Sequence, residues 1–141
     1  MFVTLFYGVL DLASGQLAYV NCGHNPPVII DSTGVKAHLR PTSPAVGMFP
    51  NIELKVQQVS LEPGDVLFFF TDGVTDARDS NGSLFTDKRL LQLLEQPAPT
   101  AEALLDRIVE SLHSHIGTAM QFDDITMMAA RRKPGLDVEP R

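Results

Sequence analysis

The most informative segment of this chain is VLFFFTDGVTDA, residues 66–77, in which an unbroken apolar run is followed by Asp72. A second stretch, QFDDITMMA at residues 121–129, has the opposite order, because Asp123 and Asp124 precede its apolar run. Apolar runs of this kind predict strands that are buried on both faces. An ionised carboxylate next to such a strand is costly to desolvate unless it is paired or binds a cation.

Two interpretations of these acidic motifs remain open on the residues alone. The only basic residue close to either motif is Arg78, so ion pairing is a weak explanation. A shared divalent metal is the leading explanation, because carboxylate oxygens are the ligands that hard cations prefer. The alternative is that both motifs are turns, since Asp72-Gly73 is a common turn dipeptide and paired aspartates can cap a strand.

The composition is that of one globular domain with an acidic surface. The chain has 141 residues, of which 44% are hydrophobic and 20% are charged, which is enough for a substantial core. Its formal net charge of −6 and sequence pI of about 5.0 argue against a nucleic-acid partner, which requires a basic surface. The only basic cluster, Arg131 to Lys133, is interpreted as a solvated end next to the C-terminal tail.

The sequence also points to a compartment. A single cysteine, Cys22, allows no internal disulfide and no cysteine-based zinc site, which fits a reducing, cytoplasmic setting. The apolar residues 1–10 have no preceding basic segment and meet Asp11 too soon for a signal peptide or a membrane span. A cytoplasmic domain without a membrane segment is therefore predicted.

Hydrophobic periodicity predicts that the first part of the chain is rich in strands. An apolar run at residues 2–10 is expected to pair with residues 16–22 as a hairpin. Residues 52–59 alternate apolar and polar side chains, as a half-exposed strand does. The predicted strands are residues 2–10, 16–22, 27–31, 35–40, 52–59, 66–71 and 124–131.

Two helices are predicted between the acidic motifs. Thr86 is a suitable N-cap for a helix at residues 87–95, and Thr100 is one for a helix at residues 101–116. Gly117 is expected to end the second helix. Their apolar residues repeat at helical spacing, so both helices should lie against a sheet.

The N-terminal strand is unusual for its position. Residues 2–10 are apolar on both faces, although no turn or cap precedes them. Such a strand needs neighbours on both edges and on both faces. We therefore expect that an upstream segment completes this fold. Without it, an open edge or apolar face should favour self-association, for example as a homodimer.

Other motifs carry weaker signals. The segment Asp79 to Gly82 is similar to the start of a calcium-binding loop, but Leu90 stands where that loop needs its glutamate, so a turn is predicted. His24, in the motif NCGHNPP, could orient a substrate, although a structural loop histidine is the favoured interpretation. The loop at residues 44–47 could line the approach to a site or serve only as a turn. No function is assigned to His38, His113 and His115.

Taken in order, four motifs resemble the C-terminal part of the PP2C-like metal-dependent serine/threonine phosphatases. They are GVLDLASGQLAYVNCGHNPPVII, SPAVGM, LEPGDVLFFFTDGVTDARD and FDDITMM. More narrowly, they resemble the SpoIIE-like or RsbU-like subfamily of bacteria, and the resemblance covers residues 2–131. It implies an α+β fold in which antiparallel sheets stack as a β-sandwich flanked by helices (αββα), without its N-terminal part. The domain would occupy residues 1–131, followed by a polar tail at residues 132–141.

The resemblance also implies a metal site. Asp72 corresponds to the family's Asp-Gly metal ligand and Asp123 to the ligand in its Asp-Asp motif, with Asp124 and Gly73 as weaker candidates. A pair of Mn²⁺ or Mg²⁺ ions would activate a water that attacks phosphorus, so no serine or cysteine nucleophile is needed. Further aspartates come from GGDFYD-like and DVSGHG-like motifs upstream in the family, and neither motif occurs in these 141 residues.

The implied function is that of a serine/threonine phosphoprotein phosphatase. Its substrate would be a phosphorylated STAS-type anti-sigma-factor antagonist, within partner-switching control of transcription or stress response. Because two aspartates form an incomplete metal cage, the chain alone is expected to be inactive or weakly active. The alternative is a non-catalytic PP2C-like module that keeps only a docking surface for a partner protein. A β-rich small-molecule-binding protein would require an apolar pocket, which the sequence does not reveal.

Overall fold

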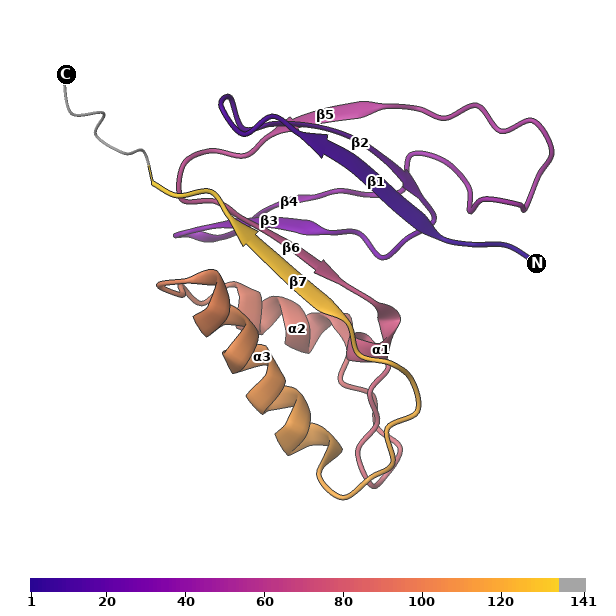
Figure 1. Ribbon diagram of the computed structural model, residues 1–141. Helices are drawn as coiled ribbons and strands as arrows, with labels where there is room; N and C mark the ends of the chain where they lie inside the picture. The colour runs from indigo at the N-terminus through magenta and orange to yellow at the C-terminus, as the bar shows by residue number, and fades with distance from the viewer. Residues whose placement is uncertain (135–141) are drawn as a thin grey trace.

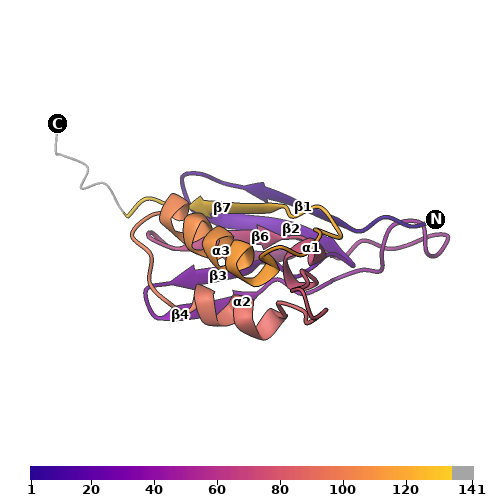
Figure 2. The same ribbon diagram turned by 90° about the horizontal axis from the view of Figure 1, so that it is seen from below.

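The computed structural model describes residues 1–134 and has three layers: a three-stranded sheet, a four-stranded sheet and helices (Figures 1 and 2). The helices cover only the outer face of the four-stranded sheet (Figure 1). The predicted α+β sandwich with flanking helices is confirmed. Its strands are β1 (Leu5–Leu10), β2 (Gln16–Cys22), β3 (Val28–Asp31), β4 (Gly34–His38), β5 (Gln57–Ser60), β6 (Val66–Phe70) and β7 (Met127–Arg131). The helices are α1 (Asp72–Thr75), α2 (Asp87–Leu94) and α3 (Ala101–Ile116).

Every strand pairing is antiparallel, and β6 is a central strand as predicted. The strand order is β1-β2-β5 in one sheet and β4-β3-β6-β7 in the other. In the second sheet β6 pairs with β3 on one edge and with β7 on the other, with Phe70 opposite Met127. The apolar run is thus buried on both faces, since Leu67 points into the space between the sheets and Phe68 into the layer under the helices.

Two clusters of buried side chains hold the layers together. One fills the space between the sheets and consists of Leu17, Tyr19, Ile29, Leu39, Leu61 and Leu67. The other lies between the four-stranded sheet and the helices, and includes Val28, Ile30, Phe68, Phe70, Leu90, Leu94, Leu104, Ile108 and Leu112. Alternate residues of β3 and β6 serve opposite layers, which explains why both strands are apolar throughout.

Both predicted helix caps are present. The hydroxyl of Thr86 accepts a hydrogen bond from the backbone N–H of Arg89 at 3.4 Å, and that of Thr100 accepts one from Ala103 at 3.0 Å. Helix α3 has the predicted boundaries and ends before Gly117, whose φ of 55° suits glycine. None of the helices within residues 1–134 is long and apolar enough to span a membrane.

One predicted strand is mostly wrong. Of residues 52–59, only the last three belong to β5, which pairs with β2 and begins with Gln57 opposite Tyr19. Beyond Tyr19 that edge of β2 is occupied by the loop after β4, because the carbonyl of Asn21 accepts hydrogen bonds from Thr42 and Ser43 at 2.8 and 3.1 Å. Residues 52–56 therefore have no strand to pair with, despite their alternating pattern.

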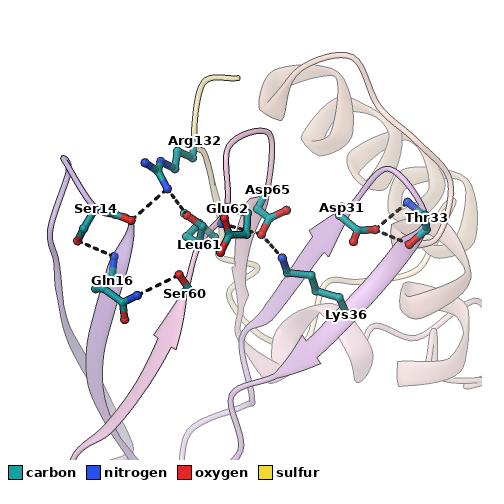
Figure 3. Close-up of polar contacts among 10 residues, drawn as sticks. All are labelled: Ser14, Gln16, Asp31, Thr33, Lys36, Ser60, Leu61, Glu62, Asp65 and Arg132. Carbon is teal, nitrogen blue, oxygen red and sulfur yellow. Dashed lines mark hydrogen bonds and ion pairs between the residues drawn. The ribbon is translucent and has the colours of Figure 1, made fainter. Parts of the chain in front are cut away.

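The interpretation of the basic cluster as a solvated end was wrong for Arg132 (Figure 3). Its guanidinium donates to the carbonyl oxygens of Leu61, Ala13 and Ser14, at 2.7, 3.1 and 3.2 Å. It thereby joins the end of β7 to the β1–β2 turn and to the segment before β6. Residues 135–141, which are most of the predicted tail, lie outside the described residues.

Near Arg132, a buried carboxylate is fully compensated (Figure 3). Asp65 is only 3% exposed, pairs with Lys36 and accepts a hydrogen bond from the backbone N–H of Glu62 at 2.9 Å. This buried aspartate is therefore a structural residue at the opposite end of β6 from Asp72.

The expected open edge of the N-terminal strand is confirmed within the described residues. β1 pairs only with β2, and Leu5, Tyr7 and Val9 are 44%, 63% and 59% exposed. The other sheet ends at β7, and an apolar hollow of about 600 Å³ between the two edges is lined by residues that include Phe6, Leu17, Phe69 and Met128.

We expect this face and edge to make the 141-residue chain self-associate, because unpaired edge strands with apolar side chains template further pairing. Light scattering over a concentration series should show a rising average mass. Val9→Lys should reduce that rise, whereas Leu12→Lys, at an 85% exposed turn position, should not. A chain that stays monomeric at every concentration would contradict this prediction.

Candidate metal centre

The fold brings the two acidic motifs together at one end of the sandwich. Because β6 and β7 are antiparallel neighbours, the residues after β6 lie beside those before β7 (Figure 1). The backbone N–H of Thr71 donates to the carbonyl of Thr126 at 3.1 Å, and the N–H of Thr126 donates to the hydroxyl of Thr71 at 3.3 Å. This pair of threonines fixes the spacing between Asp72 and the loop that holds Asp123 and Asp124.

Gly73 is where the two motifs touch. A Cβ atom at this position would lie 2.0 Å from the carbonyl oxygen of Asp124 and 2.8 Å from its carbonyl carbon. The φ of Gly73 is not positive, so the requirement for glycine here is one of space. The sequence alone suggested a turn glycine or a weak metal ligand, and it gave no sign of this close approach.

The three candidate carboxylates are all exposed. Asp72 begins α1, and its backbone carbonyl accepts a hydrogen bond from the N–H of Asp76 at 2.8 Å. The carboxylate of Asp123 accepts one from the backbone N–H of Asp124 at 2.8 Å. Because Asp72, Asp123 and Asp124 are solvent-exposed, the premise that their charges are costly to desolvate was wrong. The case for a metal therefore rests on the proximity of the motifs and on their oxygen chemistry.

The oxygen donors fit a hard cation, but they form an incomplete set. Within residues 1–134, no group of three or more histidine, cysteine or acidic side chains is close enough to hold a metal ion. Mg²⁺ takes about six oxygen ligands, several of which are commonly waters. Two carboxylates such as those of Asp72 and Asp123 would fill only part of such a shell.

Two hollows flank the contact between the motifs. Asp72 lines one of about 460 Å³ together with Thr4, His24 and Pro41. Asp123 lines the other, of about 190 Å³, which it shares with Gly73, Asp76, Arg78 and Phe122 among others. The site is thus a shallow, two-sided surface at the end of the sandwich.

The loop that carries His24 is held by Asn21, a residue that the sequence analysis missed. Asn21 is completely buried, and its side-chain oxygen accepts a hydrogen bond from the N–H of His24 at 2.8 Å. Its amide nitrogen donates to the carbonyls of Leu39 and His24, at 2.8 and 3.2 Å. The imidazole is not needed for these bonds and contacts the hydroxyl of Thr4 at 3.3 Å. In the sequence, the only sign of this role was an asparagine near the end of a strand, followed by Cys-Gly-His.

His115 stabilises the loop that follows α1. Its Nε2 lies 3.1 Å from the carbonyl oxygen of Ala77 and 2.9 Å from that of Ser83. Carbonyls only accept hydrogen bonds, so Nε2 carries a proton. Its Nδ1 lies 3.0 Å from the guanidinium of Arg89. His115 is therefore structural, and it lies outside the two hollows.

The turn predicted at Asp79 to Gly82 is confirmed, and Asp79 stabilises it. Its carboxylate accepts hydrogen bonds from the N–H groups of Ser83 and Asn81, at 2.8 and 2.9 Å. These bonds, with the one from Ser83 contributing most, hold the pKa of Asp79 below its usual value.

Acid should therefore weaken the fold partly through Asp79. A lowered folded-state pKa means that the stabilisation is fully present above the unfolded-state pKa, about 3.9, and is lost as the pH falls through the folded-state value. We expect urea midpoints measured between pH 7 and pH 3 to fall less steeply for Asp79→Asn than for the wild type. The same acid sensitivity in both proteins would disprove the assignment.

Solved structures identify the fold class as that of PP2C-type phosphatase domains. The phosphatase domain of the cell fate determinant SpoIIE from Bacillus subtilis (Mn presoaked) aligns with a TM-score of 0.70 at 16% sequence identity. That alignment covers 94% of this chain and 58% of the SpoIIE chain.

The sequence gives the family. Residues 1–133 match the family described as Stage II sporulation protein E (SpoIIE), and the chain belongs to that family. Protein IcfG of Synechocystis sp. (strain ATCC 27184 / PCC 6803 / Kazusa) is 44% identical over 132 residues, which are 94% of this chain and 21% of IcfG. The phosphoserine phosphatase RsbU of Bacillus subtilis (strain 168) is 29% identical over 136 residues, covering 94% of this chain and 40% of RsbU. The chain thus spans less than half the length of these relatives.

Proposed function

We propose that this chain supplies the β6–β7 side of a metal-dependent phosphatase site that hydrolyses phosphoserine or phosphothreonine in a protein. The observation that carries the proposal is the backbone contact between Gly73 and Asp124, which places the Asp72 and Asp123 motifs side by side. Family membership supports the reaction class, since the relative RsbU is named a phosphoserine phosphatase.

The metal proposed for the site is Mn²⁺ or Mg²⁺. Asp72 and Asp123 would be its ligands from this chain, with Asp124 and Gly73 as further candidates. When bound, such ions lower the pKa of a coordinated water and stabilise charge on phosphoryl oxygens. The contribution of this chain would be to hold the backbones of the two motifs side by side, through the hydrogen bonds between Thr71 and Thr126.

The proposed substrate is a phosphorylated STAS-type anti-sigma-factor antagonist, and the proposed setting is the cytoplasm, where partner switching controls transcription. Likeness to RsbU supports this substrate class over a small phosphate ester. The exposed position of the carboxylates also supports it, because a phosphoserine on a folded partner reaches a shallow site more easily than an enclosed one.

A second candidate function is a non-catalytic docking module. The observation in its favour is that residues 1–134 bring together no group of three potential metal-ligating side chains. On this view the chain keeps the sandwich, and its partner-binding surface is the functional part.

Phosphate release measured during a Mn²⁺ titration separates the two functions. The 141-residue chain alone should release little or no phosphate from a phosphoserine protein, because two aspartates do not fix two ions. The chain extended by an upstream segment with GGDFYD-like and DVSGHG-like motifs should hydrolyse the substrate in a metal-dependent way. Full activity of the short chain would overturn the incomplete-cage argument. Inactivity of both chains would favour the docking module.

A further inference from the structure

Arg78 is a cation placed directly beside the acidic motifs. It follows α1, is exposed, and makes no ion pair with any residue within 1–134. Its guanidinium carbon lies 4.7 Å from the centroid of the Phe122 ring, and Phe122 immediately precedes Asp123. The aromatic face therefore holds the guanidinium against the residue that precedes one of the proposed metal ligands.

The guanidinium borders a hollow of suitable size and composition. Arg78, Phe122, Asp123 and Gly73 all line the hollow of about 190 Å³. Since a water molecule takes about 30 Å³ in the liquid, this space has room for a phosphoryl group and some waters.

A phosphoryl group that binds beside the acidic motifs needs a nearby positive charge. A phosphoryl dianion that approaches Asp72, Asp123 and Asp124 is repelled unless positive charge is also present. The planar fork of a guanidinium matches two phosphoryl oxygens and keeps its charge at every physiological pH. Contact with Phe122 also restricts the side chain before binding, which reduces the entropy lost when the substrate is bound.

A second arginine shows what a purely structural contact of this type looks like. Arg89 lies over the Phe85 ring with a similar separation of 4.9 Å. Its guanidinium is already engaged by His115 at 3.0 Å, and it does not line either hollow beside the acidic motifs. Arg78 differs because its guanidinium has no ion-pair partner in the described part of the chain and borders a hollow lined by Asp123.

We propose that Arg78 binds the phosphoryl group of the phosphoserine or phosphothreonine side chain. The identity of the group bound by Arg78, a phosphorylated side chain, rests on the proposed phosphatase function. The competing role is a clamp in which Arg78 only fixes the loop of Phe122.

Phosphate binding tests this assignment separately from catalysis. Inorganic phosphate is titrated into the 141-residue chain with saturating Mg²⁺, and binding is followed by ³¹P NMR. Arg78→Ala should weaken phosphate binding about tenfold or more, as expected for a lost charge-assisted pair. Arg78→Lys should restore only part of the affinity, since an ammonium is a point charge. Arg89→Ala, the matched control, should bind phosphate as the wild type does at a temperature where thermal melts show it folded.

In the extended chain that hydrolyses phosphoserine, Arg78→Ala should raise KM for a phosphoserine peptide by a similar factor. Unchanged phosphate affinity in a folded Arg78→Ala protein would overturn the assignment and leave the clamp, as would undetectable binding by the wild type. If phosphate affinity depends on Arg78 but the extended chain releases no phosphate, the binding role is supported and the proposed phosphatase function is refuted.

Discussion

Gly73→Ala should both destabilise the chain and greatly slow phosphate release by the extended domain. The added methyl group would lie 2.0 Å from the carbonyl oxygen of Asp124, so backbone, and not a flexible side chain, has to move. Overpacking of this kind typically costs about 1–3 kcal/mol in the free energy of unfolding. Moving the Asp124 loop by about 1 Å should reduce the rate about a hundredfold, because catalysis depends on the positions of both motifs.

Urea unfolding and Mn²⁺-dependent phosphate release measure the two effects of Gly73→Ala. Gly82→Ala is the matched control, because nothing lies within 4 Å of its added Cβ while its φ of 80° still imposes strain. The control should lose about 1 kcal/mol of stability through backbone strain and keep its activity. If Gly73→Ala matched wild type in both measurements, the close contact would have no role in the site.

The sequence predicted those parts of the fold that depend on local pattern. Helix α3 has its predicted boundaries because an N-cap, an apolar repeat and a terminal glycine all lie within its own segment. The strand expected at residues 52–59 forms only in its last three residues, because pairing is decided by a distant element, here Thr42 and Ser43 at the edge of β2. Alternation indicates which face is apolar, but it does not show whether an edge is free.

The residues that the sequence analysis missed share one property. Asn21, His115 and Arg132 all bind backbone carbonyl oxygens, and most of these belong to segments far away in the chain. A carbonyl is present at every position, so the sequence around it carries no mark of such a partner. Long-range side chain to backbone bonds are therefore the part of this structure that required coordinates.

The proximity of the two acidic motifs was predictable from the sequence, but the physical reason given for a metal there was wrong. The positions of Asp72 and Asp123 at the ends of apolar runs singled them out, and the antiparallel pairing of β6 and β7 brings their motifs together. The carboxylates are not desolvated, because burial of the strand stops abruptly where the chain leaves the sheet. One residue separates buried Phe70 from exposed Asp72.

Asp72→Asn and Asp123→Asn should each remove most of the metal-dependent activity of the extended domain while leaving the fold intact. An amide keeps the shape of the side chain but loses the charge that attracts the cation. Loss of residues that merely orient metal ligands costs about 10–100-fold, so loss of a proposed ligand should cost at least about a hundredfold. Phosphate release across a Mn²⁺ titration measures it, and higher Mn²⁺ should restore part of the rate.

A stability measurement and a control variant at a neighbouring carboxylate distinguish loss of metal binding from general damage to the fold. Both aspartates are exposed and the chain carries a net charge of −6, so removing one negative charge should leave the urea midpoint unchanged or slightly higher. Asp76→Asn is the matched control, because Asp76 is exposed and lines the same hollow as Asp123 without being a proposed ligand. Equal losses in all three variants would point to the general negative field of this surface. Losses confined to Asp72 and Asp123 would support direct coordination, because each of the three variants removes one negative charge and weakens the general attraction for a cation to a similar extent.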